Sequence, residues 1–222
     1  IAKAAGIGGA DLLDIACEPE LVEIAMESSS IPVCVSSVDP KLFPDAVKAG
    51  ASMIEIGNFD SFYPDGRFFS ADEVLSLAIE SRRLAPEVVL SVTVPHVLPL
   101  DGQAQLALDL ADIGVDLIQT EGGTSSHPIS PGTLGLIEKA SPTLAGTFAI
   151  SAALKKSNYD LPVICASGLS EVTVPMALSV GAYGVGIGSA VNKLNTELAM
   201  IATVKGLRQA LDSFRSVSTI NQ

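Results

Sequence analysis

Two turns built almost entirely from small residues end two successive apolar runs in the last third of the chain. Their sequences are ASG (166–168) and GIGSA (186–190). Glycine allows a backbone to approach an anion closely, and the N–H groups of such turns can bind phosphate oxygens. We therefore predict a phosphate site at these turns; the alternative is that both are tight turns without a ligand. The predicted phosphate-binding residues are Ser167, Gly168, Ser170, Gly188 and Ser189.

A third turn of similar composition follows another apolar run. In the segment EGGT (121–124), Gly122, Gly123 and Thr124 offer backbone N–H groups and one hydroxyl. Successive N–H groups in such turns form concave anion sites, so these residues are added to the predicted ligand site. The ligand is a small phosphorylated molecule or, alternatively, flavin mononucleotide (FMN), whose phosphate would use the same turns.

Several carboxylates lie inside apolar runs that are typical of buried strands. Asp14, Glu55 and Glu121 are in three different runs, and Gln119 shares a run with Glu121. We expect Asp14 and Glu55 to converge with Gln119 or Glu121. Convergent carboxylates raise one another's pKa and suit proton transfer, or bind a divalent cation through oxygen. The alternative is a buried polar network without a catalytic role.

His96 directly follows the apolar segment VLSVTVP (89–95) and is one of two histidines in the chain. An imidazole at a strand end is suited to acid–base catalysis, whereas the alternative is a solvated loop histidine. We predict Asp14, Glu55, His96 and Glu121 as the catalytic residues. The sequence contains no cluster of Cys and His residues at the spacing typical of a metal site, so no metal ligands are predicted.

These residues require a scaffold that brings strand ends together, and the hydrophobic pattern predicts one. Short apolar runs rich in β-branched residues alternate with helical patterns along the whole chain. Such alternation is typical of parallel strands joined by right-handed crossovers. The predicted strands span residues 11–17, 32–38, 53–58, 88–95, 116–122, 162–168 and 184–190.

The number of strands and the chain length favour a closed barrel over an open sheet. The 222 residues are fewer than the roughly 250 of a typical (β/α)8 barrel, and a helical pattern precedes the first predicted strand. We predict a single TIM-type barrel domain over residues 1–222, with its first strand absent or incomplete in this chain. The active site would lie at the carboxyl ends of the strands, where long loops at 59–69 and 123–135 could cover it.

Composition narrows the classes of partner. The net charge is −12, with 13 basic against 25 acidic side chains, which disfavours binding to nucleic acid or anionic membranes. No apolar run approaches the roughly 20 residues that span a bilayer. The three cysteines lack CxxC spacing and are interpreted as buried free thiols in a reducing compartment.

Several longer segments carry a family resemblance. The segments IEIGNFDSFY, LSVTVPHVLPLD, IQTEGGTSS and GTLGLIEKASPTLA, together with ICASGLS and GVGIGSAVNKLN, resemble one family over nearly the whole chain. It is the hypothetical chloroplast reading frame family number twenty-three, a Ycf-type family of plastids and cyanobacteria. The resemblance implies a TIM-type barrel and a location in the chloroplast stroma or cyanobacterial cytoplasm, and it implies no particular reaction.

Together these features predict an enzyme of the lyase, synthase or isomerase type that acts on a small phosphorylated metabolite. The alternative is a non-catalytic barrel that binds a metabolite or a protein partner and regulates. Under that alternative, the aromatic residues of segment 59–69 would form the partner surface. An oligomer is compatible with either function.

Overall fold

Seven parallel strands form one sheet in which each strand pairs with the next strand along the chain. The computed structural model describes residues 1–123 and 126–220, with side chains to residue 216. All seven predicted strands are present, and each is shorter than its apolar run. They are β1 (Leu13–Ala16), β2 (Val33–Ser37), β3 (Met53–Ile56), β4 (Val89–Thr93), β5 (Leu117–Gln119), β6 (Val163–Ala166) and β7 (Gly184–Gly186).

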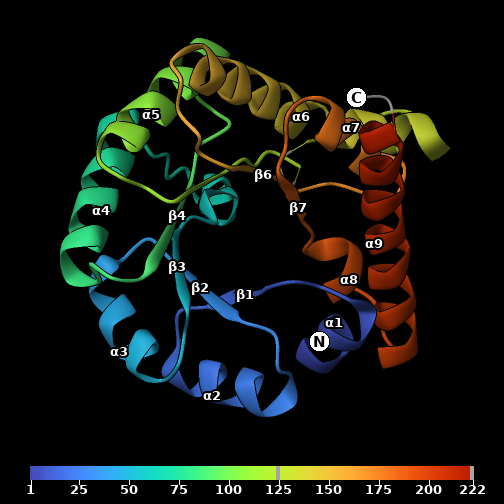
Figure 1. Cartoon of the computed structure of the whole chain (residues 1–222), viewed down its shortest axis with the longest axis horizontal. Helices are drawn as coiled ribbons and strands as arrows, with labels where there is room; N and C mark the ends of the chain where they lie inside the picture. The colour runs from blue at the N-terminus through green and yellow to red at the C-terminus, as the bar shows by residue number, and fades with distance from the viewer. Residues whose placement is uncertain (124–125, 221–222) are drawn as a thin grey trace.

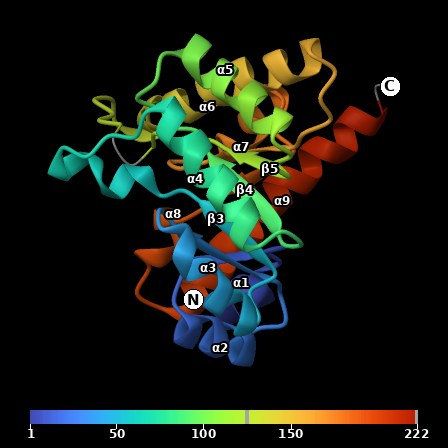
Figure 2. The same cartoon turned by 90° about the vertical axis from the view of Figure 1, so that its left-hand side faces the viewer.

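Helices follow the strands and lie outside the curled sheet (Figure 1). The α-helices are α1 (Ala2–Gly8), α2 (Pro19–Ser28), α3 (Phe43–Lys48), α4 (Ala71–Leu84), α5 (Leu100–Asp112), α6 (Gly132–Lys156), α7 (Val174–Ser179), α8 (Ser189–Asn192) and α9 (Glu197–Ile220). Short 3-10 helices are η1 (Pro40–Leu42), η2 (Phe59–Ser61) and η3 (Tyr63–Asp65). Figure 2 shows the segment between β3 and α4, coloured teal, extending outward on the left.

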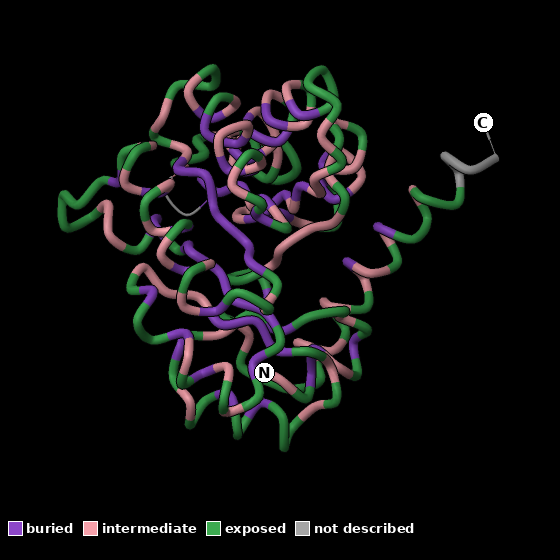
Figure 3. Tube along the Cα trace, turned by 60° about the vertical axis from the view of Figure 1, so that its left-hand side comes forward, coloured by how far each residue is buried: buried purple, intermediate pink, exposed green. Residues whose placement is uncertain are grey.

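The sheet is curled, and its edges are β1 and β7. The predicted alternation of parallel strands and helices is confirmed. The described residues show an open sheet of seven strands rather than a closed barrel of eight. Figure 3 shows that the last part of α9 extends away from the rest of the molecule.

The main hydrophobic core lies between the sheet and the surrounding helices. Val35, Ile54 and Leu90 face each other in register on β2, β3 and β4, and all three are fully buried. Each such side chain stabilises the fold by about 1.5–3 kcal/mol. Because successive strand residues point to opposite faces, residues 36, 55 and 91 point to the concave interior instead.

Helix α6 begins inside the predicted loop 123–135, at Gly132, and continues to Lys156 as an element that the sequence pattern does not predict. Its sequence contains Pro142 and Gly146, which normally disfavour helix interiors. A Cβ atom at Gly146 would lie 2.6 Å from Oε1 of Gln103 on α5. The glycine therefore permits close packing of two helices, a tertiary reason that local propensity cannot reveal. The predicted capping of α4 is confirmed, because Ser70 Oγ accepts a hydrogen bond from the Glu73 N–H.

The three cysteines are free and buried, as predicted. Burial raises the pKa of Cys17 to about 11 and raises that of Cys34 well above its usual value. Because the thiolate is the reactive species, we expect native protein at pH 8 to react slowly with Ellman's reagent. Addition of guanidinium should release three rapidly reacting thiols. Rapid titration of the native protein would contradict this burial.

Among the described residues, no helix combines the length and the apolar character needed to cross a membrane.

Candidate functional site

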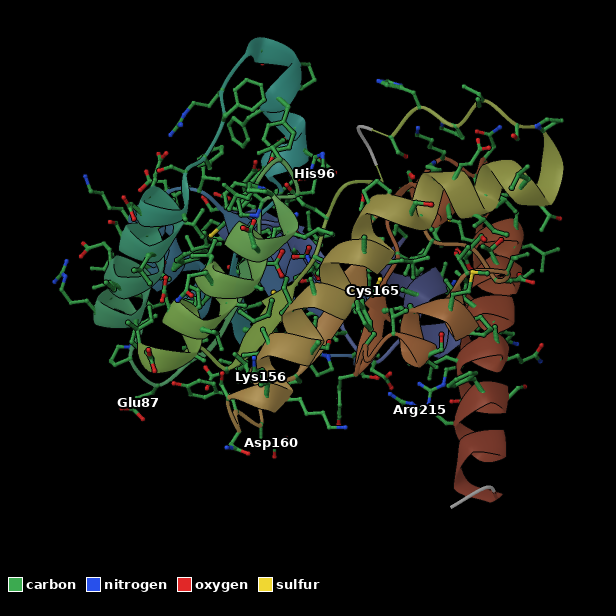
Figure 4. All side chains as sticks on the ribbon, turned by 90° about the horizontal axis from the view of Figure 1, so that it is seen from above. Glu87, His96, Lys156, Asp160, Cys165 and Arg215 are labelled. Carbon is green, nitrogen blue, oxygen red and sulfur yellow. The ribbon has the colours of Figure 1, made fainter. Side chains whose placement is uncertain are left out.

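The carboxyl ends of all seven strands lie at one end of the sheet, because the strands are parallel and adjacent. Figure 4 shows His96, which follows β4, at this end of the molecule. Glu87 and Asp160, which precede β4 and β6, lie at the opposite end. The four predicted catalytic residues lie in two clusters, one inside the curled sheet and one at the carboxyl ends of the strands.

The interior cluster is centred on Glu55, whose side chain is buried. Its Oε2 accepts a hydrogen bond from Ser91 Oγ at 2.8 Å. Its Oε1 accepts hydrogen bonds from Gln119 Nε2 at 2.7 Å and from Thr93 Oγ1 at 3.2 Å. The structure thus brings Glu55 and Gln119 together from β3 and β5, as the strand alternation suggested.

Asp14 is the solvent-exposed end of the same cluster. Ser36 Oγ donates a hydrogen bond to Asp14 Oδ1 at 2.6 Å, and Ser36 is paired in register with Glu55. Burial, together with the charge of Asp14, raises the pKa of Glu55 to about 8. Partial desolvation in the concave interior raises the pKa of Asp14 to about 6, although its side chain still contacts solvent. Glu55 therefore keeps its proton to a higher pH than Asp14 does.

The second cluster, the end cluster, consists of Asp60, His96 and Glu121. Nδ1 of His96 lies 3.2 Å from Oε1 of Glu121 and 3.4 Å from Oδ1 of Asp60. Both carboxylates are buried, and the His96 side chain is 16% exposed. Burial lowers the pKa of His96, but the hydrogen bond and charge of Glu121 and the charge of Asp60 outweigh it and raise the pKa overall.

Glu121 is held in place by three donors besides the imidazole. Tyr63 donates its phenolic O–H to Oε1 at 2.5 Å, and the backbone N–H of His96 donates to the same oxygen at 3.2 Å. The backbone N–H of Asp60 donates to Oε2 at 3.2 Å. These contacts fix the orientation of the carboxylate toward His96.

Glu121 therefore does not join Glu55, although both were predicted to serve one site. Strand β5 ends at Gln119, and the chain then turns so that the hydroxyl of Thr120 packs against those of Thr143 and Thr147 on α6. Sequence reasoning did not single out Asp60 or Tyr63. The available signal was the position of their loop directly after a predicted strand, where functional residues of such folds gather.

The ASG turn lies against the turn after β5. A Cβ atom at Gly123 would lie 2.3 Å from the backbone nitrogen of Gly168. Ser167 and Gly168 both have φ of 73°, the left-handed region, where glycine is favoured. Direct packing of the two backbones thus explains part of the small-residue pattern without a ligand. The hydroxyl of Ser167 donates to Asp60 Oδ2 at 3.4 Å, which joins this turn to the end cluster.

The remaining predicted ligand-binding residues lie in three different settings. The N–H of Ser170 donates to Thr173 Oγ1 at 2.8 Å, so it already has a partner within the chain. Gly188 has open space beside it and precedes Ser189, the first residue of α8. Gly122 has φ of 121° and packs close to the His96 ring. Thr124 lies outside the described residues.

A family model described as "Protein of unknown function (DUF561)" matches residues 1–217. The chain belongs to this family. The DUF561 chain is 46% identical over 202 residues to the "Uncharacterized protein ycf23" of Cyanophora paradoxa, covering 90% of this chain and 81% of that protein. It is 37% identical over 215 residues to the protein of the same name in Pyropia yezoensis, covering 97% and 77%. The expected Ycf family membership is confirmed, and these relatives come from plastid-bearing organisms.

Solved structures similar to this chain include TIM-barrel-type enzymes. A "Thiamine phosphate pyrophosphorylase" from Pyrococcus furiosus has a TM-score of 0.62 at 14% identity, covering 96% of this chain and 88% of that chain. A "3-Hexulose-6-Phosphate Synthase" has a TM-score of 0.65 at 16% identity, covering 95% and 94%. A putative deoxyribose-phosphate aldolase from Coccidioides immitis has a TM-score of 0.58 at 17% identity, covering 82% and 71%. At these identities the likeness shows the fold alone.

Proposed function

We propose that this protein is an enzyme of the lyase, synthase or isomerase type that acts on a small phosphorylated metabolite. Its structural neighbours are named for reactions of phosphorylated compounds, which supports the substrate class. The ends of β6 and β7 are adjacent, and they carry the small residues that suit a phosphate. The proposed phosphate-binding residues are Ser167, Gly168, Ser170, Gly188 and Ser189, with Gly122, Gly123 and Thr124 beside them.

The observation that carries the proposal is the pair of unequal carboxyl groups inside the sheet. Asp14 contacts solvent and accepts the Ser36 hydroxyl, while Glu55 is buried and holds its proton more tightly. Two titratable groups whose environments separate their pKa values can act as a base and an acid at the same pH. In this assignment Asp14 accepts a proton from the substrate. Glu55 remains protonated, so that no second negative charge lies near Asp14.

The described strands contain no lysine, so we propose proton transfer rather than a Schiff base formed at a strand. His96 and Glu121 complete the catalytic set at the carboxyl end of the sheet. FMN is the proposed alternative ligand, bound through its phosphate at the same turns.

We propose that an eighth strand pairs with β1 and β7 and closes a single-domain TIM-type barrel, because exposed strand edges are generally covered. We place the protein in the chloroplast stroma or the cyanobacterial cytoplasm, since its relatives come from plastid-bearing organisms.

The aromatic partner surface of the alternative function is only partly present. Phe59 and Phe69 are buried, and Phe62 and Tyr63 are half-buried. Phe68 is 55% exposed and stacks on Tyr63. Because the loop turns most of its rings inward, we do not favour a docking function for it.

Hydrogen–deuterium exchange tests the proposed proton transfer without a known product. The protein is incubated in D2O with phosphorylated aldoses, ketoses and 2-oxo acids, and loss of C–H signals is followed by NMR. We expect exchange with at least one compound and a decrease of about 100-fold or more in Asp14→Asn, the usual range for losing a general base. Asp160→Asn, an exposed change at the opposite end, is the control and should keep the full rate.

Two outcomes would count against an enzyme of this kind. The first is equal exchange in Asp14→Asn and the native protein. The second is saturable binding of inorganic phosphate with no exchange for any compound, which would favour the regulatory barrel.

A further inference from the structure

The end cluster combines one imidazole and two carboxylates, which are the ligand types of many protein-bound transition metals. One ligand atom from each of Asp60, His96 and Glu121 lies within 4.8 Å of the others. From this geometry we infer that the three side chains bind one divalent transition-metal cation. No metal-binding spacing is present in the sequence, because the three side chains follow three different strands, β3, β4 and β5.

The two distances from Nδ1 of His96 suit coordination of one ion. Metal–ligand distances of about 2.1 Å place neighbouring ligand atoms about 3.0–3.4 Å apart in octahedral or tetrahedral geometry. The Nδ1 distances to the two carboxylate oxygens are 3.2 and 3.4 Å. Both are longer than a typical charge-assisted N–H···O bond of about 2.7–2.9 Å, and a single N–H can point directly at only one of two oxygens.

The charge of the cluster also favours a cation. With both carboxylates ionised and His96 protonated, the three side chains carry a net charge of −1. Hydrogen bonds from Tyr63, Ser167 and two backbone N–H groups already stabilise the buried carboxylates, and a cation would add to that stabilisation. A divalent cation bound to neutral His96 and two carboxylates brings the net charge of the group to zero.

The surrounding contacts would keep the ligand side chains oriented for metal binding. Tyr63 and two backbone N–H groups fix Glu121, and the Tyr63 ring packs edge-on against the His96 imidazole with centroids 5.3 Å apart. Such outer contacts orient metal ligands, and their loss typically weakens metal affinity 10–100-fold. We therefore assign Tyr63 as a positioning residue for the metal.

The position of the metal also bears on the proposed phosphate site, and this step rests on the proposed function. Asp60 accepts the Ser167 hydroxyl, so its carboxylate borders the turn proposed to bind phosphate. A phosphate bound at this turn and the Asp60 carboxylate would repel each other. A cation between them would attract both and would polarise a substrate oxygen as a Lewis acid. His96 would then act as a ligand rather than as a proton carrier.

Manganese binding to the full chain tests this inference directly. Metal-free protein is titrated with MnCl2, and free Mn²⁺ is measured by electron paramagnetic resonance. We expect one equivalent to bind. Tyr63→Phe should weaken binding about tenfold, the lower end for loss of an outer contact, and Glu121→Gln, which keeps the shape of the side chain, should weaken it further. His127→Gln changes an exposed histidine outside the cluster and should bind as the native chain does.

Either of two results would overturn the metal site. One is native protein that binds no Mn²⁺ and no Zn²⁺; the other is Glu121→Gln with unchanged affinity and a native circular dichroism spectrum. Deuterium exchange that persists in EDTA would leave the proposed enzyme intact without the metal. Stoichiometric metal binding with no exchange would support the site and argue against the proposed reaction.

Discussion

Gly123→Ala is expected to destabilise the protein strongly and to abolish the proposed phosphate binding. The new Cβ atom would lie 2.3 Å from the nitrogen and 2.4 Å from the Cα atom of Gly168. Both are backbone atoms, so no side-chain rotation relieves the overlap, and the two turns must separate. Overpacking of this kind costs about 3 kcal/mol, the upper end of the usual range.

The same separation would displace the proposed ligand site. Ser167 precedes Gly168 and contacts Asp60, so a shift of this turn removes the contact between the β6 turn and the end cluster. At about 2–4 °C per kcal/mol for a domain of this size, the midpoint of thermal unfolding should fall by about 6–12 °C. Calorimetry measures the midpoint, and titration with inorganic phosphate measures the binding.

Gly102→Ala provides the matched control. The new Cβ atom would meet Pro99 Cγ at 3.4 Å, an ordinary contact, and the position lies in helix α5. Alanine is favoured over glycine in helices, so this variant should be more stable by about 0.5–1 kcal/mol. Equal midpoints for Gly123→Ala and the native protein would show that the two turns do not pack as described.

Glu55→Gln is expected to flatten the dependence of stability on pH. Glu55 has a pKa raised to about 8 in the folded chain by burial and by Asp14, against 4.5 for the ordinary group. A raised pKa means that the folded state binds the proton more tightly. Its contribution to stability is therefore complete below pH 4.5 and is lost as pH rises through 8.

The loss between pH 5 and pH 9 should be about 2–5 kcal/mol in the native protein. Glutamine cannot ionise, so Glu55→Gln should show only the smaller slope left by Asp14 and His96 and, above about pH 8, by the buried thiols, whose pKa values are also raised. At pH 9 the variant should be more stable than the native protein. Urea unfolding at pH 5, 6, 7, 8 and 9 measures the curve.

Glu87→Gln is the control for this series, because Glu87 is exposed and lies at the opposite end of the molecule. It should reproduce the native pH profile. A Glu55→Gln profile parallel to the native one would mean that Glu55 is ionised throughout this range.

The sequence by itself determined the class of fold and the faces of its strands. Apolar runs alternating with helical patterns predicted all seven strands, because each pattern reflects which local face is buried. The same alternation placed Glu55 and Gln119 on one face of the sheet, where they meet. The free cysteines and the Ser70 cap were also predictable, since both depend on nearby residues.

Only the tertiary structure decided which side chains form the end cluster. It also decided why glycine is required where the turns after β5 and β6 meet. Asp60 and Glu121 are 61 positions apart and meet because two loops fold over the same end of the sheet. The positions of Gly123 and Gly168 leave no room for a side chain, because their backbones are in contact. Local periodicity records which face of a strand is buried, but it carries no information on the path of a loop. Contacts between loops depend on the packing of the whole sheet, and at this end of the sheet that packing creates the proposed chemistry.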